Sequence, residues 1–166
     1  MTSYLFSWLK EKFGALDLAA FERSHPYHWL VWEAGQWHPP ERSGQTLIAS
    51  AALEPPGPGE SLAIAMRPDA RRPYLTMGRG AENDIVVDDA TLSRVHLMLM
   101  RTEGGGWTVR DAGSSNGTRL EGALLGVGKP EALKSGARLQ AGSVHFTYLE
   151  PRDLLERLKL KAVAPR

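Results

Sequence analysis

From residue 59 onward, apolar residues occur in short runs that turn-forming residues separate every eight to twelve positions or so. The runs are Leu62–Met66, Tyr74–Met77, Ile85–Val87, Leu97–Arg101, Trp107–Asp111, Thr118–Leu120 and Val144–Leu149. Glycine-containing segments at residues 104–106 and 121–122 lie between runs, as expected for hairpin turns. This pattern predicts an all-β fold, an antiparallel β-sandwich whose loops gather at the ends of the sheets.

The first part of the chain has a different pattern. Residues 4–21 carry apolar side chains at approximately helical spacing and predict a helix, with Thr2 or Ser3 as its cap and Gly14 weakening its middle. We expect the apolar face of this helix to pack on the domain that follows. A membrane-surface helix is the alternative, but residues 10–12 supply too little positive charge to hold anionic lipid.

Further segments frame the predicted sandwich. Residues 28–32 predict a short strand, and residues 46–53 predict either a strand or a short helix capped at Ser43. The proline- and glycine-rich residues 54–60 predict a linker, since such residues join neither helix nor sheet. Leu154, Leu155 and Leu158 predict a short amphipathic helix near the C-terminus. The predicted organisation is an N-terminal extension over 1–58, a domain over 59–150, and a C-terminal helix and tail over 151–166.

Composition narrows the classes of function. Hydrophobic residues make up 42% of the chain and charged residues 23%, as in folded globular domains. The net charge of +1 argues against a nucleic-acid partner, and the absence of cysteine excludes disulfides, thiol catalysis and cysteine-based zinc sites. Neither a signal peptide nor an apolar run of membrane-spanning length is apparent, so we expect a soluble, cytoplasmic protein without membrane partners.

Catalytic and metal chemistry find little support. His25, His28 and His38 could be imagined as metal ligands, but surface or packing roles are the better interpretation of three histidines without a cysteine or a well-placed carboxylate. No serine, aspartate and histidine stand in the sequence context of a hydrolase triad. We therefore expect no enzyme activity, no metal and no cofactor.

Three polar clusters fall in loops between predicted strands. They are Gly78-Arg79, Ser93-Arg94-Val95-His96 and Ser115-Asn116-Gly117-Thr118. Together they offer two guanidinium groups, short hydroxyls and a carboxamide. Arginine binds phosphate through charge-assisted, often bidentate hydrogen bonds, and an asparagine side chain can both donate to and accept from a peptide backbone. The set therefore suits a phosphorylated side chain on an extended peptide.

The order of these clusters resembles the signature of the forkhead-associated (FHA) domain family over about residues 62 to 150. The matching pattern runs Gly78-Arg79, Asn83-Asp84-Ile85, Ser93-Arg94 with His96, the strand from Trp107 to Asp111, and Ser115-Asn116-Gly117-Thr118. The turn at Glu121-Gly122 departs from it, because the family more often has Asn-Gly there. The resemblance implies an eleven-stranded FHA-type sandwich whose loops at one end bind phosphothreonine peptides.

The resemblance also implies a role for each residue by position. Arg79 binds the phosphate or the adjoining peptide main chain, Ser93 and Arg94 hold phosphate oxygens, Ser115 adds a phosphate contact, and Asn116 bonds the peptide backbone. Structural roles fall to His96, which braces the loops, and to Gly78 and Gly117. Thr91 lies in the loop that selects a residue C-terminal to the phosphothreonine.

The function that follows is a phosphothreonine-dependent adaptor in signalling. Its partner is a phosphothreonine-containing protein, for which a Ser/Thr kinase or a kinase substrate is a candidate. The alternative is a scaffolding or assembly protein that uses an FHA fold without phosphate binding. The joint presence of Arg79, Ser93, Arg94 and Asn116 favours the phosphate reader, since a decayed site would have lost at least one of them.

Overall fold

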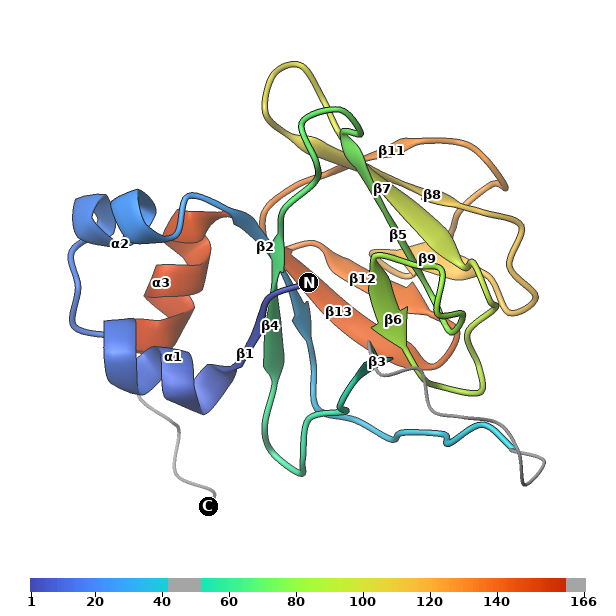
Figure 1. The fold of residues 1–166 in the computed structure, drawn as a ribbon, viewed down its shortest axis with the longest axis horizontal. Helices are drawn as coiled ribbons and strands as arrows, with labels where there is room; N and C mark the ends of the chain where they lie inside the picture. The colour runs from blue at the N-terminus through green and yellow to red at the C-terminus, as the bar shows by residue number, and fades with distance from the viewer. Residues whose placement is uncertain (42–51, 161–166) are drawn as a thin grey trace.

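A computed structural model describes residues 1–41 and 52–160, and two β-sheets make up its main body (Figure 1). The first sheet has seven strands in the order β1-β4-β2-β13-β12-β9-β10: Ser3–Leu5, Leu62–Met66, His28–Trp32, Val144–Leu149, Arg138–Ala141, Thr118–Leu120 and Ala123–Leu124. The second has six in the order β11-β8-β7-β5-β6-β3: Glu131–Leu133, Trp107–Asp111, Leu97–Arg101, Tyr74–Gly78, Ile85–Val87 and Ala52–Leu53. The predicted β-sandwich is confirmed, with more strands than the eleven that the resemblance implied.

Pairing within the sheets is antiparallel except around β6. This strand pairs parallel with both β3 and β5, with Ile85 opposite Met77 and Val86 opposite Ala52. The seven strands predicted after residue 59 are all present, and the one at Tyr74 extends by one residue to Gly78. Of the predicted 46–53 segment, residues 52–53 form β3, and the remainder lies outside the described residues.

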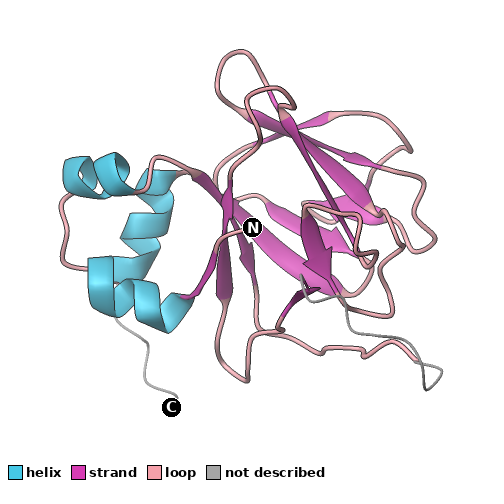
Figure 2. Ribbon diagram, viewed as in Figure 1, coloured by secondary structure: helices cyan, strands magenta, loops and turns pink. Residues whose placement is uncertain are grey.

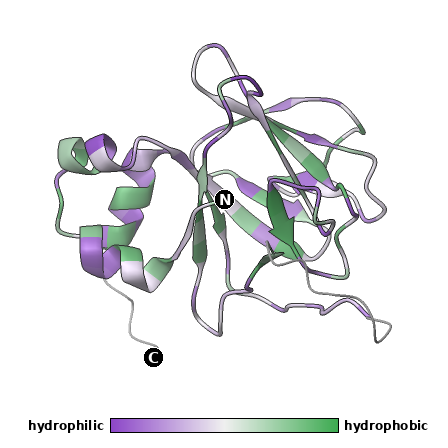
Figure 3. Ribbon diagram, viewed as in Figure 1, coloured by the Kyte–Doolittle hydropathy of each residue, from purple (hydrophilic) through white to green (hydrophobic). Residues whose placement is uncertain are grey.

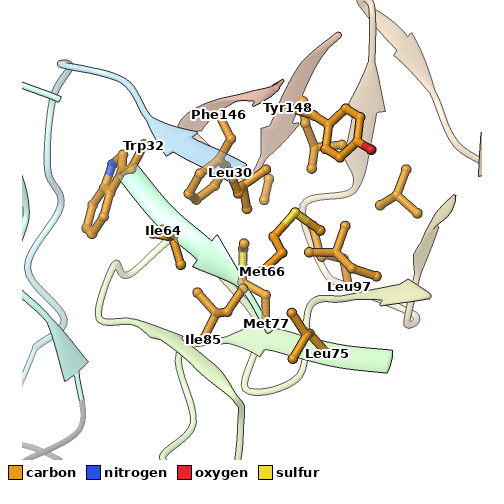
Figure 4. Close-up of a cluster of buried hydrophobic side chains, with 14 of the residues drawn as sticks. Leu30, Trp32, Ile64, Met66, Leu75, Met77, Ile85, Leu97, Phe146 and Tyr148 are labelled. Carbon is orange, nitrogen blue, oxygen red and sulfur yellow. The ribbon is translucent and has the colours of Figure 1, made fainter. Parts of the chain in front are cut away.

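Strands β2 and β4 of the first sheet are buried on both of their faces. Along β4, Leu62, Ile64 and Met66 point between the sheets, whereas Ala63 and Ala65 belong to a second apolar cluster on the outer face. Figure 4 shows Ile64 and Met66 together with Met77 of the opposite sheet. Successive side chains of a strand point to opposite faces, so burial on both faces explains why β4 is an uninterrupted apolar run (Figure 3).

The outer face is covered by three short helices (Figure 2). They are α1, Phe6–Phe13, α2, Leu18–Ser24, and α3, Pro151–Lys159. Leu9, Phe21 and Leu154 from these helices are fully buried with Trp29 and Val31 of β2. The predicted packing of the N-terminal helical segment and the predicted C-terminal helix are thus both found.

The single helix predicted over residues 4–21 is wrong in detail, because two helices occupy this region. Asp17 begins the second one, accepting a hydrogen bond from the Ala20 backbone N–H at 2.8 Å. The predicted caps Thr2 and Ser3 do not serve, since residues 3–5 pair with β4 and the position before α1 is Leu5. Because β1 leads directly into α1, the residue before the helix is the last residue of the strand, and no side chain caps the helix.

The interpretation of residues 28–32 as part of a separate extension needs correction. These residues form β2, which lies between β4 and β13 and pairs with both. A bidentate ion pair, with N···O distances of 2.5 and 2.8 Å, joins Arg157 of α3 to Glu33 and fixes the end of β2 to the helical layer. The sandwich is therefore continuous across the boundary predicted at residue 58. None of the described helices is both long and apolar enough to span a membrane.

Candidate functional site

The three polar clusters come together at one end of the sandwich. The loop after β5 lies against the loop before β7, where the Arg79 N–H donates to the Ser93 carbonyl and the Gly80 N–H donates to the Arg94 carbonyl, each at 2.9 Å. Gly78 makes this close approach possible: a Cβ there would lie 2.2 Å from the Arg94 carbonyl oxygen. A side chain at position 78 would push the two loops apart.

His96 connects the second and third clusters from beneath. Its Nδ1 accepts the Ser93 backbone N–H at 3.0 Å, which leaves the ring proton on Nε2 to donate to the Gly117 carbonyl at 2.9 Å. The ring is fully buried, and this burial lowers the pKa of His96 below its usual value despite opposing effects of Gly117 and Asp111. The neutral imidazole thus hydrogen-bonds to both loops through its two ring nitrogens.

Asp111 organises the third cluster, a role that was not predicted from the sequence. Its carboxylate accepts hydrogen bonds from the backbone N–H groups of Gly113 and Ser114 at 2.9 Å each, and from the hydroxyls of Ser114 and Thr118 at 2.5 and 2.7 Å. Burial would raise the pKa of Asp111, but these hydrogen bonds outweigh it and hold the pKa below its ordinary value. An ionised Asp111 therefore shapes the turn at residues 112–117.

Hydrogen bonds also join the loops on their solvent-exposed side. The Asn116 side-chain amide donates to the Thr91 carbonyl at 2.8 Å, and Ser93 Oγ accepts the Ser115 backbone N–H at 2.9 Å. Gly117 has a φ of +80°, a backbone conformation that glycine adopts readily. No described residue hydrogen-bonds to the Asn116 Oδ1 atom, so this acceptor is available on an exposed side chain.

Both candidate phosphate-binding arginines retain free donors. Arg79 uses Nε to hold the Leu92 carbonyl at 3.2 Å, and its two terminal nitrogens make no hydrogen bond within the described residues. Arg94 is 76% exposed and lies 3.4 Å from the Glu82 carboxylate. An ion pair this exposed contributes little to stability, so Arg94 can exchange Glu82 for a stronger anion.

Hydrogen bonds fix the side chain of Thr91, whereas a residue in a freely adaptable specificity loop would be mobile. Its hydroxyl donates to the fully buried Asp89 carboxylate at 2.6 Å and accepts the Ser143 N–H at 2.9 Å. Asp89 also accepts the His38 backbone N–H at 2.9 Å. Thr91 thus braces the β6–β7 loop, and its part in selecting a peptide residue stays a prediction.

Three acidic neighbours of the site were not predicted from the sequence, for different reasons. Asp89 and Asp111 are buried hydrogen-bond acceptors. The one sign of this in the sequence is the group of short polar residues that follows each of them. Glu82 stands twelve residues before Arg94, and only the folded loop brings the two together.

The three histidines considered as metal ligands serve other purposes. His25 stacks on Phe21 with 5.3 Å between ring centroids, and His28 hydrogen-bonds the Tyr148 hydroxyl. His38 Nδ1 lies 3.6 Å from the Asp89 carboxylate. Over residues 1–41 and 52–160, no group of three or more His, Asp or Glu side chains is arranged to hold a metal ion.

Comparison with known proteins places this arrangement in a family. The model of the FHA domain family matches residues 75–142, which include all three clusters. An oxoglutarate dehydrogenase inhibitor from Corynebacterium diphtheriae is 32% identical over 114 residues, covering 65% of this chain and 77% of the relative. The chain belongs to the FHA domain family. The glycogen accumulation regulator GarA of Mycolicibacterium smegmatis is 35% identical over 78 residues, 47% of each chain.

Solved structures agree on the fold of this FHA protein. An engineered FHA domain with a Myc-pTBD peptide superposes with a TM-score of 0.54 at 15% identity, covering 80% of this chain and 97% of that chain. A structure described as concerning phosphothreonine-dependent FHA domain interactions gives a TM-score of 0.50 at 19% identity, with coverages of 74% and 95%. At these identities the likeness establishes the FHA-type sandwich alone.

Proposed function

We propose that this protein captures a phosphothreonine-bearing segment of a partner protein in the loops 79–84, 88–96 and 112–117. One observation carries the proposal: the terminal nitrogens of Arg79, the exposed guanidinium of Arg94 and the Ser93 hydroxyl are gathered at one end of the sandwich on loops braced from below. A phosphate dianion offers three strong acceptor oxygens to such donors.

Each site residue then has a task that its contacts permit. Ser93 Oγ already accepts a backbone N–H, so its own proton is free to donate to a phosphate oxygen. Ser115 stands beside it on the neighbouring loop and adds a hydroxyl to the same oxygens. Asn116, held through its amide nitrogen, offers Oδ1 to a backbone N–H of the bound peptide.

The protein acts as a binding regulator in this proposal and performs no chemistry of its own. Two curated relatives are named as an inhibitor and as a regulator, and both names describe control of other processes. The partner carries phosphothreonine, so it is a Ser/Thr kinase or one of its substrates. A solved structure of an FHA domain complexed with the intracellular domain of another protein illustrates capture of a protein partner by this family.

The test is a screen of the purified chain against an oriented phosphothreonine peptide library, with the same library unphosphorylated as control. We expect enrichment of phosphorylated peptides only, and loss of that enrichment in Arg79→Ala. Equal retention of both libraries would contradict the proposal and favour the phosphate-independent scaffold.

A further inference from the structure

A second basic site lies at the opposite end of the sandwich. The candidate phosphothreonine loops follow β5 and β8 and precede β7, whereas β7 ends at Arg101, β8 begins at Trp107 and β2 begins at His28. The five residues of β7 separate the two ends by roughly 15 Å. Here a pocket of about 210 Å³ is lined by His28, Arg67, Arg101, Gly105 and Trp107, among others.

The charged side chains that line this pocket are all positive. Arg67 lies with its guanidinium carbon 3.8 Å from the centroid of the Tyr27 ring, which fixes it beside the pocket. Within the described ranges, neither Arg67 nor Arg101 forms a salt bridge. No aspartate or glutamate lines the pocket, although Glu150 acts on His28 from outside it.

His28 adds an oriented donor to the two arginines. Its Nδ1 is hydrogen-bonded to the hydroxyl of Tyr148, which is fully buried and labelled in Figure 4. Burial raises the pKa of Tyr148, with Glu150 adding to the effect, so the phenol keeps its proton. Nδ1 is the one hydrogen-bond partner of this buried hydroxyl among the described residues, so the phenol donates its proton to Nδ1. The imidazole proton is therefore on Nε2, the ring atom left without a hydrogen-bond partner in the described part of the chain.

We propose that this pocket binds an anionic oxygen group, a carboxylate or a phosphate, through Arg67, Arg101 and His28. Two arginines and a histidine N–H donor line the pocket with no acidic side chain among them, and arginine binds such anionic groups with charge-assisted hydrogen bonds. The volume exceeds that of a single water several times over, so a group of several heavy atoms fits.

This assignment is independent of the proposed phosphothreonine site and gives the protein a binding site at each end. The two-sheet body lies between them, and β7 and β8 run from one site to the other. The chain can therefore hold a phosphorylated partner at one end while the other end takes an acidic side chain of a protein or a free anion.

Nuclear magnetic resonance titration of the full chain tests the assignment. The probes are inorganic phosphate and, separately, an unphosphorylated capped triglutamate peptide, each measured against sodium chloride of equal ionic strength. We follow the Gly105 amide and the Trp107 indole N–H. Saturable shifts of both signals are expected with at least one probe. The probe that produces them identifies the source as a free anion or an acidic protein segment.

Matched variants make the result decisive. R67Q/R101Q should bind the probe about tenfold more weakly or worse, whereas R23Q/R152Q, which removes the same charge elsewhere, should bind as the parent does. Arg79→Ala should leave the Gly105 and Trp107 shifts intact, which separates this pocket from the phosphothreonine site. Shifts that do not saturate, or that persist unchanged in R67Q/R101Q, would overturn the assignment.

Discussion

The Oγ atom of Ser93 accepts the backbone N–H of Ser115 at 2.9 Å, and this hydrogen bond joins the β6–β7 loop to the β8–β9 loop. A serine hydroxyl that accepts in this way still has its proton to donate. The same atom thus sets the distance between two loops and presents a donor to the ligand.

Substitution Ser93→Ala should therefore weaken phosphopeptide binding more than it weakens the fold. Losing one hydrogen bond to a charged group corresponds to about 1.5–3 kcal/mol, or roughly ten- to hundredfold in affinity. The Ser115 N–H is exposed and can turn to water, so the melting temperature should change little. Calorimetric titration together with thermal unfolding separates the two effects, and a large loss of stability at unchanged affinity would contradict this role.

Gly78 should not tolerate even a methyl group. The Cβ of Gly78→Ala would meet backbone atoms of Ser93 and Arg94, the nearest at 2.2 Å, and the backbone there is held by two hydrogen bonds. We expect destabilisation of about 1–3 kcal/mol, as for other overpacked sites, together with weaker peptide binding. Gly104→Ala is the matched control, because nothing lies within 4 Å of its Cβ. Chemical denaturation of both variants checks this, and equal midpoints would refute the close approach.

Glu82 should act as a built-in competitor for the phosphate. Its carboxylate lies 3.4 Å from Arg94 and repels an incoming dianion. Glu82→Gln is expected to raise phosphopeptide affinity several-fold at low ionic strength, with the gain shrinking as salt screens the charge. Glu22→Gln, on the exposed side of α2, removes the same charge away from the site and should leave affinity unchanged. Titrations at two salt concentrations decide the matter, and a loss of affinity in Glu82→Gln would mean that Glu82 positions Arg94.

Stability should fall as the pH drops below about 6.5, the ordinary pKa of histidine. Burial lowers the pKa of His25, His28 and His96, so the unfolded chain binds more protons than the folded chain between the folded pKa and 6.5. Stability therefore rises with pH across that window and is fully present above it. Thermal unfolding of the free protein between pH 5 and pH 8 measures this, and a melting temperature that rises on acidification would be inconsistent with it.

Much of the fold could be predicted because many of its strands have a recognisable hydrophobic pattern in the sequence. Short apolar runs between turn residues located β4, β5, β6, β7, β8, β9 and β13. Strands β11 and β12 were missed, since Glu131–Leu133 and Arg138–Ala141 expose a polar residue for nearly every apolar one they bury. β11 is an edge strand of three residues and β12 an interior strand of four, and segments this short give little hydrophobic pattern. Residues 28–32 were recognised as a strand, but only the pairing with β4 and β13 showed that they belong inside the sandwich.

The candidate site, too, could be predicted only in part from the sequence. Arg79, Ser93, Arg94, Ser115 and Asn116 could be proposed from their order, and the structure places their loops in direct contact. The roles of Asp111 and Asp89 depend on burial and on several converging donors, which a sequence does not display. Likewise, the pocket at His28 forms from segments far apart along the chain, and no local pattern foretells it.

Binding of one peptide in phosphorylated and unmodified form tests the central claim most directly. A peptide selected from the library is titrated into the full chain by calorimetry as phosphothreonine, phosphoserine, aspartate and threonine versions. We predict measurable binding of the phosphothreonine version and weaker binding of phosphoserine, which lacks one methyl contact. We predict no detectable binding of aspartate, whose carboxylate lacks the third oxygen, or of threonine, which carries no anionic group. Equal affinity for the threonine and phosphothreonine versions would contradict the account.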